Sequence, residues 1–485
     1  MVLHVCRVFV LLVVITHTVW SQEVSAATAT ETRTASSIKE ATRVHRWKNT
    51  NGITNFNIEV RGKVEVTDDD KDIKSVSNDG YVQITKTIFG SRRAIIIESI
   101  GGGKFKKEYY EGRSKMDWDP HGKEWLGEIL PEIVRSSTLG AEGRVNRIFA
   151  KGGVPAVLEE ISNLEGDYTR AHYAKLLLDK NIPEKEMANV VTTLAEEIES
   201  AYYLSTVFQE HVAKMLSTPE AANAFYLGVQ KIDSDYYQAV VLKEALKKFP
   251  ASPKQVKVIL QTAATMDSDY YLSVVLTALL EEEGIKEESL TELIIVSKNI
   301  PSDYYRSQVL IKAIEKSGLS KTALKSVIDA LGDVDSDYYK TGVVMRMADR
   351  SSMDGDVQDQ VIKLVGTTVS SDYYASSALN SIISKQKLTD ESFKELVTVA
   401  GNLGSANYAS DVLRRASQEN LSKNKLIDIL DAAGNIDSDH YLSEVLMGLA
   451  SQVSTSDAAV KDAYRRAAKK IDSETYYGKV LKAID

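Results

Sequence analysis

Residues that could perform chemistry are few in this sequence, and no group of them has the spacing of a known catalytic or metal-binding motif. The seven histidines, of which no two stand at a spacing typical of metal ligands, are His4, His17, His45, His121, His172, His211 and His440. Cys6 is the only cysteine, and the Gly-x-Ser-x-Gly motif of serine hydrolases does not occur. His121 with Glu124, at the start of a predicted helix, is the best candidate for an acid–base pair, and an exposed capping residue is the other interpretation. A hydrolase whose site lies where the predicted β unit meets the helical repeats is one hypothesis. The sequence otherwise indicates a protein that is not an enzyme and uses no cofactor.

Three aspartates form a second pattern with chemical meaning. Asp68, Asp70 and Asp72 stand at the first, third and fifth positions of a calcium-loop spacing, and Asp79 stands at the twelfth. The sixth position, where such a loop needs glycine, is Ile73, and strand-like rather than helical sequence flanks the pattern. These aspartates are therefore kept as a metal-site candidate, and a solvated acidic turn is the other interpretation.

A third pattern, Ser-Asp-Tyr-Tyr, recurs along the chain with a nearly constant period. The second tyrosine of the motif or of its variants recurs at steps of 33 to 35 residues, at Tyr203, Tyr237, Tyr271, Tyr305, Tyr339, Tyr374, Tyr408, Tyr441 and Tyr476. Periods of this size are typical of stacked supersecondary units. Each period contains two apolar patterns with helical spacing. Residues 138–485 are therefore predicted to form an α-solenoid of HEAT/ARM-like helix pairs, about ten in number.

The first half of the motif predicts helix starts. Serine suits the N-cap position, where its hydroxyl accepts a hydrogen bond from a free backbone amide. The aspartate that follows it, at positions 235, 269, 303, 337, 372 and 439, places negative charge at the positive end of the helix dipole. We therefore interpret Ser-Asp as a helix-capping device, and a repeated anion or metal site is the alternative.

The two tyrosines of each motif are expected to differ in role, because adjacent helix positions point about 100° apart. In the last three repeats the first position becomes Asn407, His440 and Thr475, whereas the second stays tyrosine. The second tyrosines are therefore predicted to be buried between units as a structural row. The first tyrosines are predicted to be partly exposed, either as part of the same inter-unit packing or as a binding stripe, and the stripe residues are Tyr236, Tyr270, Tyr304, Tyr338 and Tyr373.

A small β unit is predicted before the repeats, at residues 54–137. Apolar and polar residues alternate over residues 56–66, and strand-like runs follow at 81–87, 93–99 and 105–110. An amphipathic helix with Trp125, Leu126, Ile129, Leu130 and Ile133 on one face comes next. These patterns predict an antiparallel meander of about four strands with one face covered by that helix.

The first residues are typical of an export signal. Arg7 precedes the apolar run at residues 8–15, which is too short to span a membrane, and small residues follow. Residues 1–21 are therefore predicted to be a signal peptide, and an uncleaved N-terminal anchor is the alternative. Residues 22–53 contain an Ala/Thr/Ser-rich stretch and are predicted to be a flexible spacer. The protein is thus expected to be exported to a periplasmic or extracellular location, without disulfides once Cys6 is removed.

The helix pairs that open with Ser-Asp-Tyr-Tyr resemble the HEAT-like repeats of bacterial envelope proteins. The β unit joined to them is similar to soluble extensions of BlaR/MecR-type membrane sensor peptidases, so the resemblance covers residues 55–485. It implies an extracytoplasmic sensor or adaptor part. The sequence has no His-Glu-x-x-His motif, so the resemblance does not imply peptidase activity.

The charge balance narrows the class of partner. The 485-residue chain has 59 basic and 68 acidic side chains and a formal net charge of −9, whereas binding to nucleic acid phosphates needs a basic surface. We therefore expect no nucleic acid partner, and a membrane contact only through an uncleaved N-terminus. The main hypothesis is a scaffold that binds a protein or peptide partner. A ligand-sensing regulatory part is the alternative, and the oligomeric state stays open.

Overall fold

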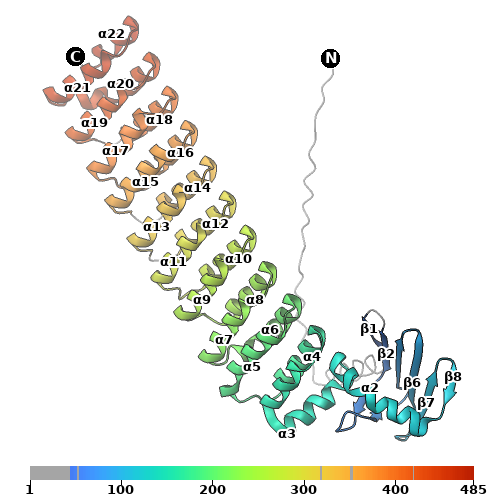
Figure 1. Cartoon of the computed structure of the whole chain (residues 1–485). Helices are drawn as coiled ribbons and strands as arrows, with labels where there is room; N and C mark the ends of the chain where they lie inside the picture. Colours follow the sequence, from blue (N-terminus) through green and yellow to red (C-terminus); the bar gives the residue numbers. More distant parts are fainter. Residues whose placement is uncertain (1–43, 52–53, 317–318, 350–352, 419, 485) are drawn as a thin grey trace, which may run out of the picture. The chain divides into compact units, whose positions relative to one another are not determined.

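The computed structural model describes residues 44–51, 54–316, 319–349, 353–418 and 420–484 (Figure 1). These residues form two compact units, one through Val157 together with residues 163–169, and one of residues 158–162 and the chain from Arg170 onward. The predicted signal peptide and residues 22–43 of the predicted spacer lie outside the described residues. Within the described ranges, no helix has both the length and the apolar character that crossing a membrane requires.

The first unit contains a six-stranded antiparallel sheet and a separate hairpin. The strands of the sheet, in spatial order, are β1 (Val44–Asn51), β2 (Thr54–Arg61), β5 (Tyr81–Ile88), β6 (Ser91–Ser99), β7 (Phe105–Glu111) and β8 (Ser114–Met116). The hairpin pairs β3 (Val64–Val66) with β4 (Ile73–Val76). Each strand of the sheet pairs with the neighbour that precedes it in this order, so the sheet is a meander from which the β3–β4 hairpin projects.

The sheet differs from the sequence prediction in two respects. Residues 44–51, expected in the spacer, instead form the edge strand β1 and pair with β2 along its whole length, from Val44 opposite Arg61 to Asn51 opposite Thr54. An edge strand has one neighbour and can be largely polar, so it lacks the apolar alternation that signals a strand. The expected strand 56–66 is also divided, because Gly62 turns the chain at a φ of 82° that other residues avoid.

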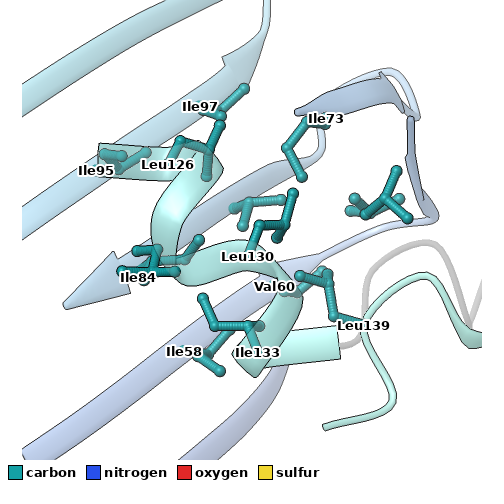
Figure 2. Close-up of a cluster of buried hydrophobic side chains, with 14 of the residues drawn as sticks. Ile58, Val60, Ile73, Ile84, Ile95, Ile97, Leu126, Leu130, Ile133 and Leu139 are labelled. Atoms are coloured by element: carbon teal, nitrogen blue, oxygen red, sulfur yellow. The ribbon is translucent and has the colours of Figure 1, made fainter. Parts of the chain in front are cut away.

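The core of this unit lies between the sheet and α2 (Lys123–Ser136). Leu126, Leu130 and Ile133 project from the helix onto apolar side chains of the central strands, as Figure 2 shows. The strand residues that Figure 2 labels in this core are Ile58, Val60, Ile84, Ile95 and Ile97 of the sheet and Ile73 of the β3–β4 hairpin, and all of them are buried. The predicted covering helix and the inward-facing side chains of 56–60 are therefore found as the apolar patterns indicated. A short π-helical turn, η1 (Trp118–Gly122), leads into α2.

The remaining elements are helices. They are α3 (Ala141–Ser162), α4 (Asp167–Leu178), α5 (Glu184–Glu197), α6 (Ala201–Met215), α7 (Pro219–Val229), α8 (Asp235–Lys248), α9 (Pro253–Ala263), α10 (Asp269–Glu281), α11 (Glu287–Ser297), α12 (Asp303–Ile314), α13 (Lys321–Gly332), α14 (Asp337–Asp349), α15 (Gly355–Thr368), α16 (Asp372–Lys385), α17 (Asp390–Gly401), α18 (Ala406–Ala416), α19 (Lys423–Ala433), α20 (Asp439–Ser454), α21 (Ala458–Ala468) and α22 (Glu474–Lys482).

These helices alternate between two rows. The even-numbered helices from α6 to α22, here called A helices, begin at the Ser-Asp-Tyr-Tyr motif or its variants, and the odd-numbered ones from α5 to α21 are B helices. Each A helix packs against the preceding and following A helices, and each B helix against neighbouring B helices (Figure 1). Apolar residues such as Val275 and Leu276 of α10 and Leu293 and Ile294 of α11 are fully buried between the two rows. The predicted α-solenoid after an antiparallel β unit is confirmed.

Candidate functional site

The Ser-Asp-Tyr-Tyr motif lies at the N-terminal ends of the A helices, where serine is the N-cap residue as predicted. The hydroxyls of Ser234, Ser268 and Ser302 accept from the backbone N–H of the second tyrosine, each at a long 3.5 Å. Ser371 and Ser405 are also N-cap residues but form no such side-chain bond. The serine hydroxyl therefore contributes less to capping than the sequence suggested.

The aspartate of the motif makes a contact that the sequence analysis missed. Its carboxylate accepts a hydrogen bond from the backbone N–H of the N-cap serine in the next repeat, 33 or 34 residues later. The oxygen–nitrogen distances are 2.8 Å for Asp235–Ser268, 2.9 Å for Asp269–Ser302, 2.7 Å for Asp303–Ser336, 2.8 Å for Asp337–Ser371, 2.7 Å for Asp372–Ser405 and 2.8 Å for Asp439–Ser473. A charge-assisted bond of this length is strong. These aspartate bridges therefore join consecutive units as well as occupying helix N-termini.

The first tyrosines are exposed. The side chains of Tyr202, Tyr236, Tyr270, Tyr304, Tyr338 and Tyr373 have exposed fractions between 48% and 63%. Among the described residues of the second unit, these six are the only phenylalanine, tyrosine or tryptophan side chains in the exposed class. Large apolar groups exposed in one repeated position are a feature of interaction surfaces.

The second tyrosines are half-buried, which corrects the expectation of a fully buried structural row. All nine, from Tyr203 to Tyr476, have intermediate exposure. The apolar layer between the helices is instead occupied by residues four positions later in the helix, such as Val241 and Val275. The second tyrosine stands at the beginning of its helix, where its ring packs against other tyrosine rings rather than entering the apolar layer.

The two kinds of tyrosine form one continuous structure, the tyrosine ladder, in which the thirteen rings contact one another in the order Tyr203, Tyr202, Tyr237, Tyr236, Tyr271, Tyr270, Tyr305, Tyr304, Tyr339, Tyr338, Tyr374, Tyr373 and Tyr408. Ring centroids are 4.9–5.1 Å apart within a motif and 5.7–6.1 Å apart between repeats. The interplanar angles of 61–71° are those of favourable edge-to-face pairs. Each first tyrosine therefore both contacts the next repeat and faces solvent.

The ladder is interrupted after Tyr408. Asn407 takes the place of the next first tyrosine, so it presents no ring to Tyr441. In the following repeat His440 takes over that position, and its ring lies 5.0 Å from Tyr441 and 6.0 Å from Tyr476. The ladder is therefore continuous from α6 to α18 and has a separate short piece from α20 to α22.

Acidic side chains accompany the ladder. Asp233, Asp267, Asp335 and Asp437 each stand three positions before a first tyrosine or its histidine replacement. All four are exposed, and none forms an ion pair with another residue that the structure describes. Exposed carboxylates without ion-pair partners among the described residues therefore immediately precede the N-terminal ends of four A helices.

The acidic pattern of the β unit is engaged in ion pairs. Asp70 accepts from Arg144 at 2.8 Å and from Arg147 at 2.6 Å, and Asp72 pairs with Lys107 at 3.0 Å. Asp68 lies 3.7 Å from Lys151. Asp70 and Asp72 are thus paired with basic side chains, whereas Asp68 stays 67% exposed to solvent, and within the described part of the chain no three His, Cys, Asp or Glu residues gather as metal ligands.

Two further features of the β unit were considered for chemistry. His121 and Glu124 are both exposed at the start of α2 and have no hydrogen-bond partner among the residues described. An open hollow of about 370 Å³ lies over β1, β2 and α2, and it is lined by His45, Arg46, Trp47, Lys48, Phe56, Ile58, Glu132, Ser136 and Tyr168. Its size falls at the lower end of the range for ligand sites.

Comparison with known proteins provides no family. No protein-family profile and no curated protein matches the sequence. One solved structure, described as a circular tandem repeat protein with novel repeat topology and enhanced subunit contact surfaces, aligns with 76% of this chain and 92% of its own at 12% identity and a TM-score of 0.19. Another, from the computational design of self-assembling cyclic protein homooligomers, aligns with 71% of this chain and 97% of its own at 12% identity and a TM-score of 0.11.

Neither structure relates this chain to BlaR/MecR-type sensor peptidases. Similarities at this level carry no argument about activity or partner. The helical-repeat fold therefore rests on the order and packing of the helices themselves.

Proposed function

We propose that this protein is a scaffold that binds a partner protein or peptide along the exposed row of first tyrosines. The observation that carries the proposal is that these six rings repeat at one position per helix pair and are joined into a single ladder. In a solenoid, equivalent positions line up along one surface, and tyrosine is enriched where proteins bind one another.

The rigidity of the ladder supports this function. Every first tyrosine from Tyr236 to Tyr373 has ring contacts with the second tyrosines of its own and the next repeat, so its side chain is held before a partner arrives. Binding then costs less conformational entropy than ordering free side chains would. An extracytoplasmic location belongs to the same proposal and is supported by the apolar start of the sequence.

The alternatives receive less support from the geometry. A hydrolase needs an acid, a base and a nucleophile within hydrogen-bond reach, and His121 has no such neighbours among the described residues. A ligand-sensing role would use the hollow beside Trp47, which is open and shallow. The tyrosine row is the feature that repeats over most of the chain.

Affinity capture tests the proposal. The intact chain and a variant with Tyr236, Tyr270, Tyr304, Tyr338 and Tyr373 changed to serine are compared as baits in an envelope extract. We expect proteins retained by the intact chain to be lost from the variant. Recovery of the same partners by both baits would contradict the proposal.

A matched control removes exposed apolar groups elsewhere. Leu227 of α7 and Ile295 of α11 are exposed on B helices with fractions of 53% and 54%, close to those of the first tyrosines. The variant with both changed to serine is expected to retain the partners. Circular dichroism of all three proteins establishes that the helices are intact.

A further inference from the structure

The exposed edge of the tyrosine ladder combines two kinds of group that attract cations. Aromatic faces attract Arg and Lys side chains through their quadrupole, and Arg also stacks on tyrosine. Asp233, Asp267 and Asp335 are exposed, have no ion-pair partner among the described residues, and stand three positions before Tyr236, Tyr270 and Tyr338. A basic partner is therefore complementary in charge to this edge, whereas an acidic one is repelled.

The spacing of the rings restricts the shape of that partner. Tyr236 and Tyr270 are linked through the ring of Tyr271, which lies 5.7 Å from the first and 5.1 Å from the second. Because successive first tyrosines stand at equivalent positions of adjacent packed A helices, their spacing is about the 8–10 Å between packed helix axes, and the two ring contacts are compatible with this spacing. Three residues of a polyproline II helix advance about 9.3 Å and return to the same face.

Other regular conformations fit this row less well. In a β-strand every third residue points alternately to opposite faces, so only every second ring would be contacted by the same side. An amphipathic α-helix presents a wide apolar stripe and is bound in a groove, whereas the ladder is one exposed ring wide and bordered by carboxylates. Aromatic rows are a known way to bind polyproline II segments.

We propose that the row of first tyrosines from Tyr202 to Tyr373 binds an extended, basic polyproline II segment that has Arg or Lys at about every third residue. The inference rests on the proposed function and specifies the partner for that same surface. A segment of about fifteen residues spans five of the six rings.

Fluorescence anisotropy with synthetic peptides tests this partner class on the full chain. The probe is a fluorescein-labelled peptide of five Arg-Pro-Pro triplets. Three comparison peptides have five Glu-Pro-Pro triplets, five Ala-Pro-Pro triplets, or the same five Arg and ten Pro with the arginines contiguous. We expect the Arg-Pro-Pro peptide to bind at least roughly tenfold more tightly than each of the others.

The outcomes separate charge, conformation and spacing. Equal affinity for the Ala-Pro-Pro peptide would show that the carboxylates and cation–π contacts do not contribute to binding. Equal affinity for the peptide with contiguous arginines would show that binding does not depend on an Arg at every third residue. Tighter binding of an Ala-rich helical peptide with Arg at every seventh residue would show that the surface prefers a helical partner to a polyproline II segment. Each of these results overturns the proposal.

Variants of the chain locate the binding. Changing Asp233, Asp267 and Asp335 to asparagine is expected to lower the affinity for the Arg-Pro-Pro peptide about tenfold. The matched control E287Q/E288Q/E292Q removes the same charge from B helix α11 and is expected to leave the affinity unchanged. Equal loss in both variants would mean non-specific attraction to an acidic protein and would overturn the site.

The tyrosine variant distinguishes this inference from the broader function. The five-serine variant is expected not to bind the Arg-Pro-Pro peptide. The corresponding five-phenylalanine variant is expected to bind it, because the aromatic rings remain. If the intact chain does not bind the peptide but still captures proteins through its tyrosines, the partner class is wrong and the scaffold function stands. If neither occurs, both are wrong.

Discussion

Consecutive repeats of the solenoid are joined at seams, where a seam is the contact from one A helix to the next, and the seams differ in their contacts. The seam from α6 to α8 has a ring contact but no aspartate bridge, because Ala201 stands at the aspartate position, and the seam from α20 to α22 has a bridge and the ring contact of His440 with Tyr476. Five consecutive seams, from α8–α10 to α16–α18, contain both an aspartate bridge and a ring contact between tyrosines. The seam from α18 to α20 contains neither, because Ala406 offers no carboxylate to Ser438 and Asn407 offers no ring to Tyr441. We call these the complete seams and the interrupted seam.

The apolar packing does not differ between them. Val412 and Leu413 of α18 and Val445 and Leu446 of α20 are fully buried at the interrupted seam, as their equivalents are elsewhere. Stacking of the helix pairs therefore needs only the apolar layer. The aspartate bridges and the ring contacts are an additional set of contacts along one edge, and both are missing at the interrupted seam.

The largest effect is expected from breaking an aspartate bridge in a complete seam. Asp303→Ala leaves the part-buried N–H of Ser336 without its acceptor, which costs about 1–3 kcal/mol in the free energy of unfolding. Hydrogen exchange of the amides in α12 and α14 reports the local loss. Asp303→Asn keeps an acceptor oxygen and is expected to lose less, so equal losses in the two variants would contradict the bridge.

Removing one ring from the ladder should have the next largest effect. Tyr304 contacts Tyr305 and Tyr339 at centroid distances of 5.1 and 5.9 Å. Tyr304→Ser is expected to destabilise this seam by about 1 kcal/mol, the size of an aromatic pair contribution, whereas Tyr304→Phe keeps both ring contacts. Urea unfolding of the two variants measures the difference, and an equally stable serine variant would show that the ladder adds nothing to stability.

These contacts also show which parts of the structure could be predicted from the sequence. The solenoid was predictable because Ser-Asp-Tyr-Tyr recurs with the period of a helix pair, and the exposure of the first tyrosine was predictable because Asn407 and His440 replace it. The aspartate bridge was not, because its partner is a backbone N–H some 33 residues away and a backbone group leaves no trace in the sequence.

Packing of the second tyrosines was mispredicted for a related reason. The sequence places Tyr237 and Val241 on one face of α8, but Val241 is buried and Tyr237 only half-buried, because the ring stands at the open end of the helix. In the β unit, the polar edge strand β1 lacked an apolar pattern, and the basic partners of Asp70 come from Arg144 and Arg147, more than seventy residues later. The pairing of β1 and the ion pairs of Asp70 depend on contacts between segments that are distant in the sequence, which a local pattern does not reveal.

Adding the two missing contacts to the interrupted seam is expected to increase stability by a smaller amount. Ala406→Asp combined with Asn407→Tyr supplies both missing contacts and is expected to stabilise α20 to α22 by about 0.5–1 kcal/mol, since a net hydrogen bond and a ring pair are each of this size and ordering the new side chains offsets part of the gain. Slower hydrogen exchange in α20 measures the effect. Unchanged exchange in the double variant would mean that the two repeats are not in register for these contacts.

The smallest effect concerns an ion pair between two B helices next to the interrupted seam. Asp457, the N-cap residue of α21, lies 2.7 Å from Lys423 of α19, and this hydrogen-bonded ammonium, together with the N–H of Val460, holds the pKa of the Asp457 carboxyl below its usual range. Because the folded protein prefers the ionised form, the pair's contribution is present above the unfolded pKa of 3.8 and is lost as the pH falls through the lower folded pKa.

Asp457→Asn isolates that contribution, because asparagine keeps the helix cap while removing the charge. We expect the stability difference between the two proteins, measured by hydrogen exchange in α21, to be small at pH 6, since the pair is exposed and screened by salt, and to vanish once the pH falls below the folded pKa of Asp457. A difference that persists unchanged at low pH would assign the effect to the helix cap rather than to the charge pair.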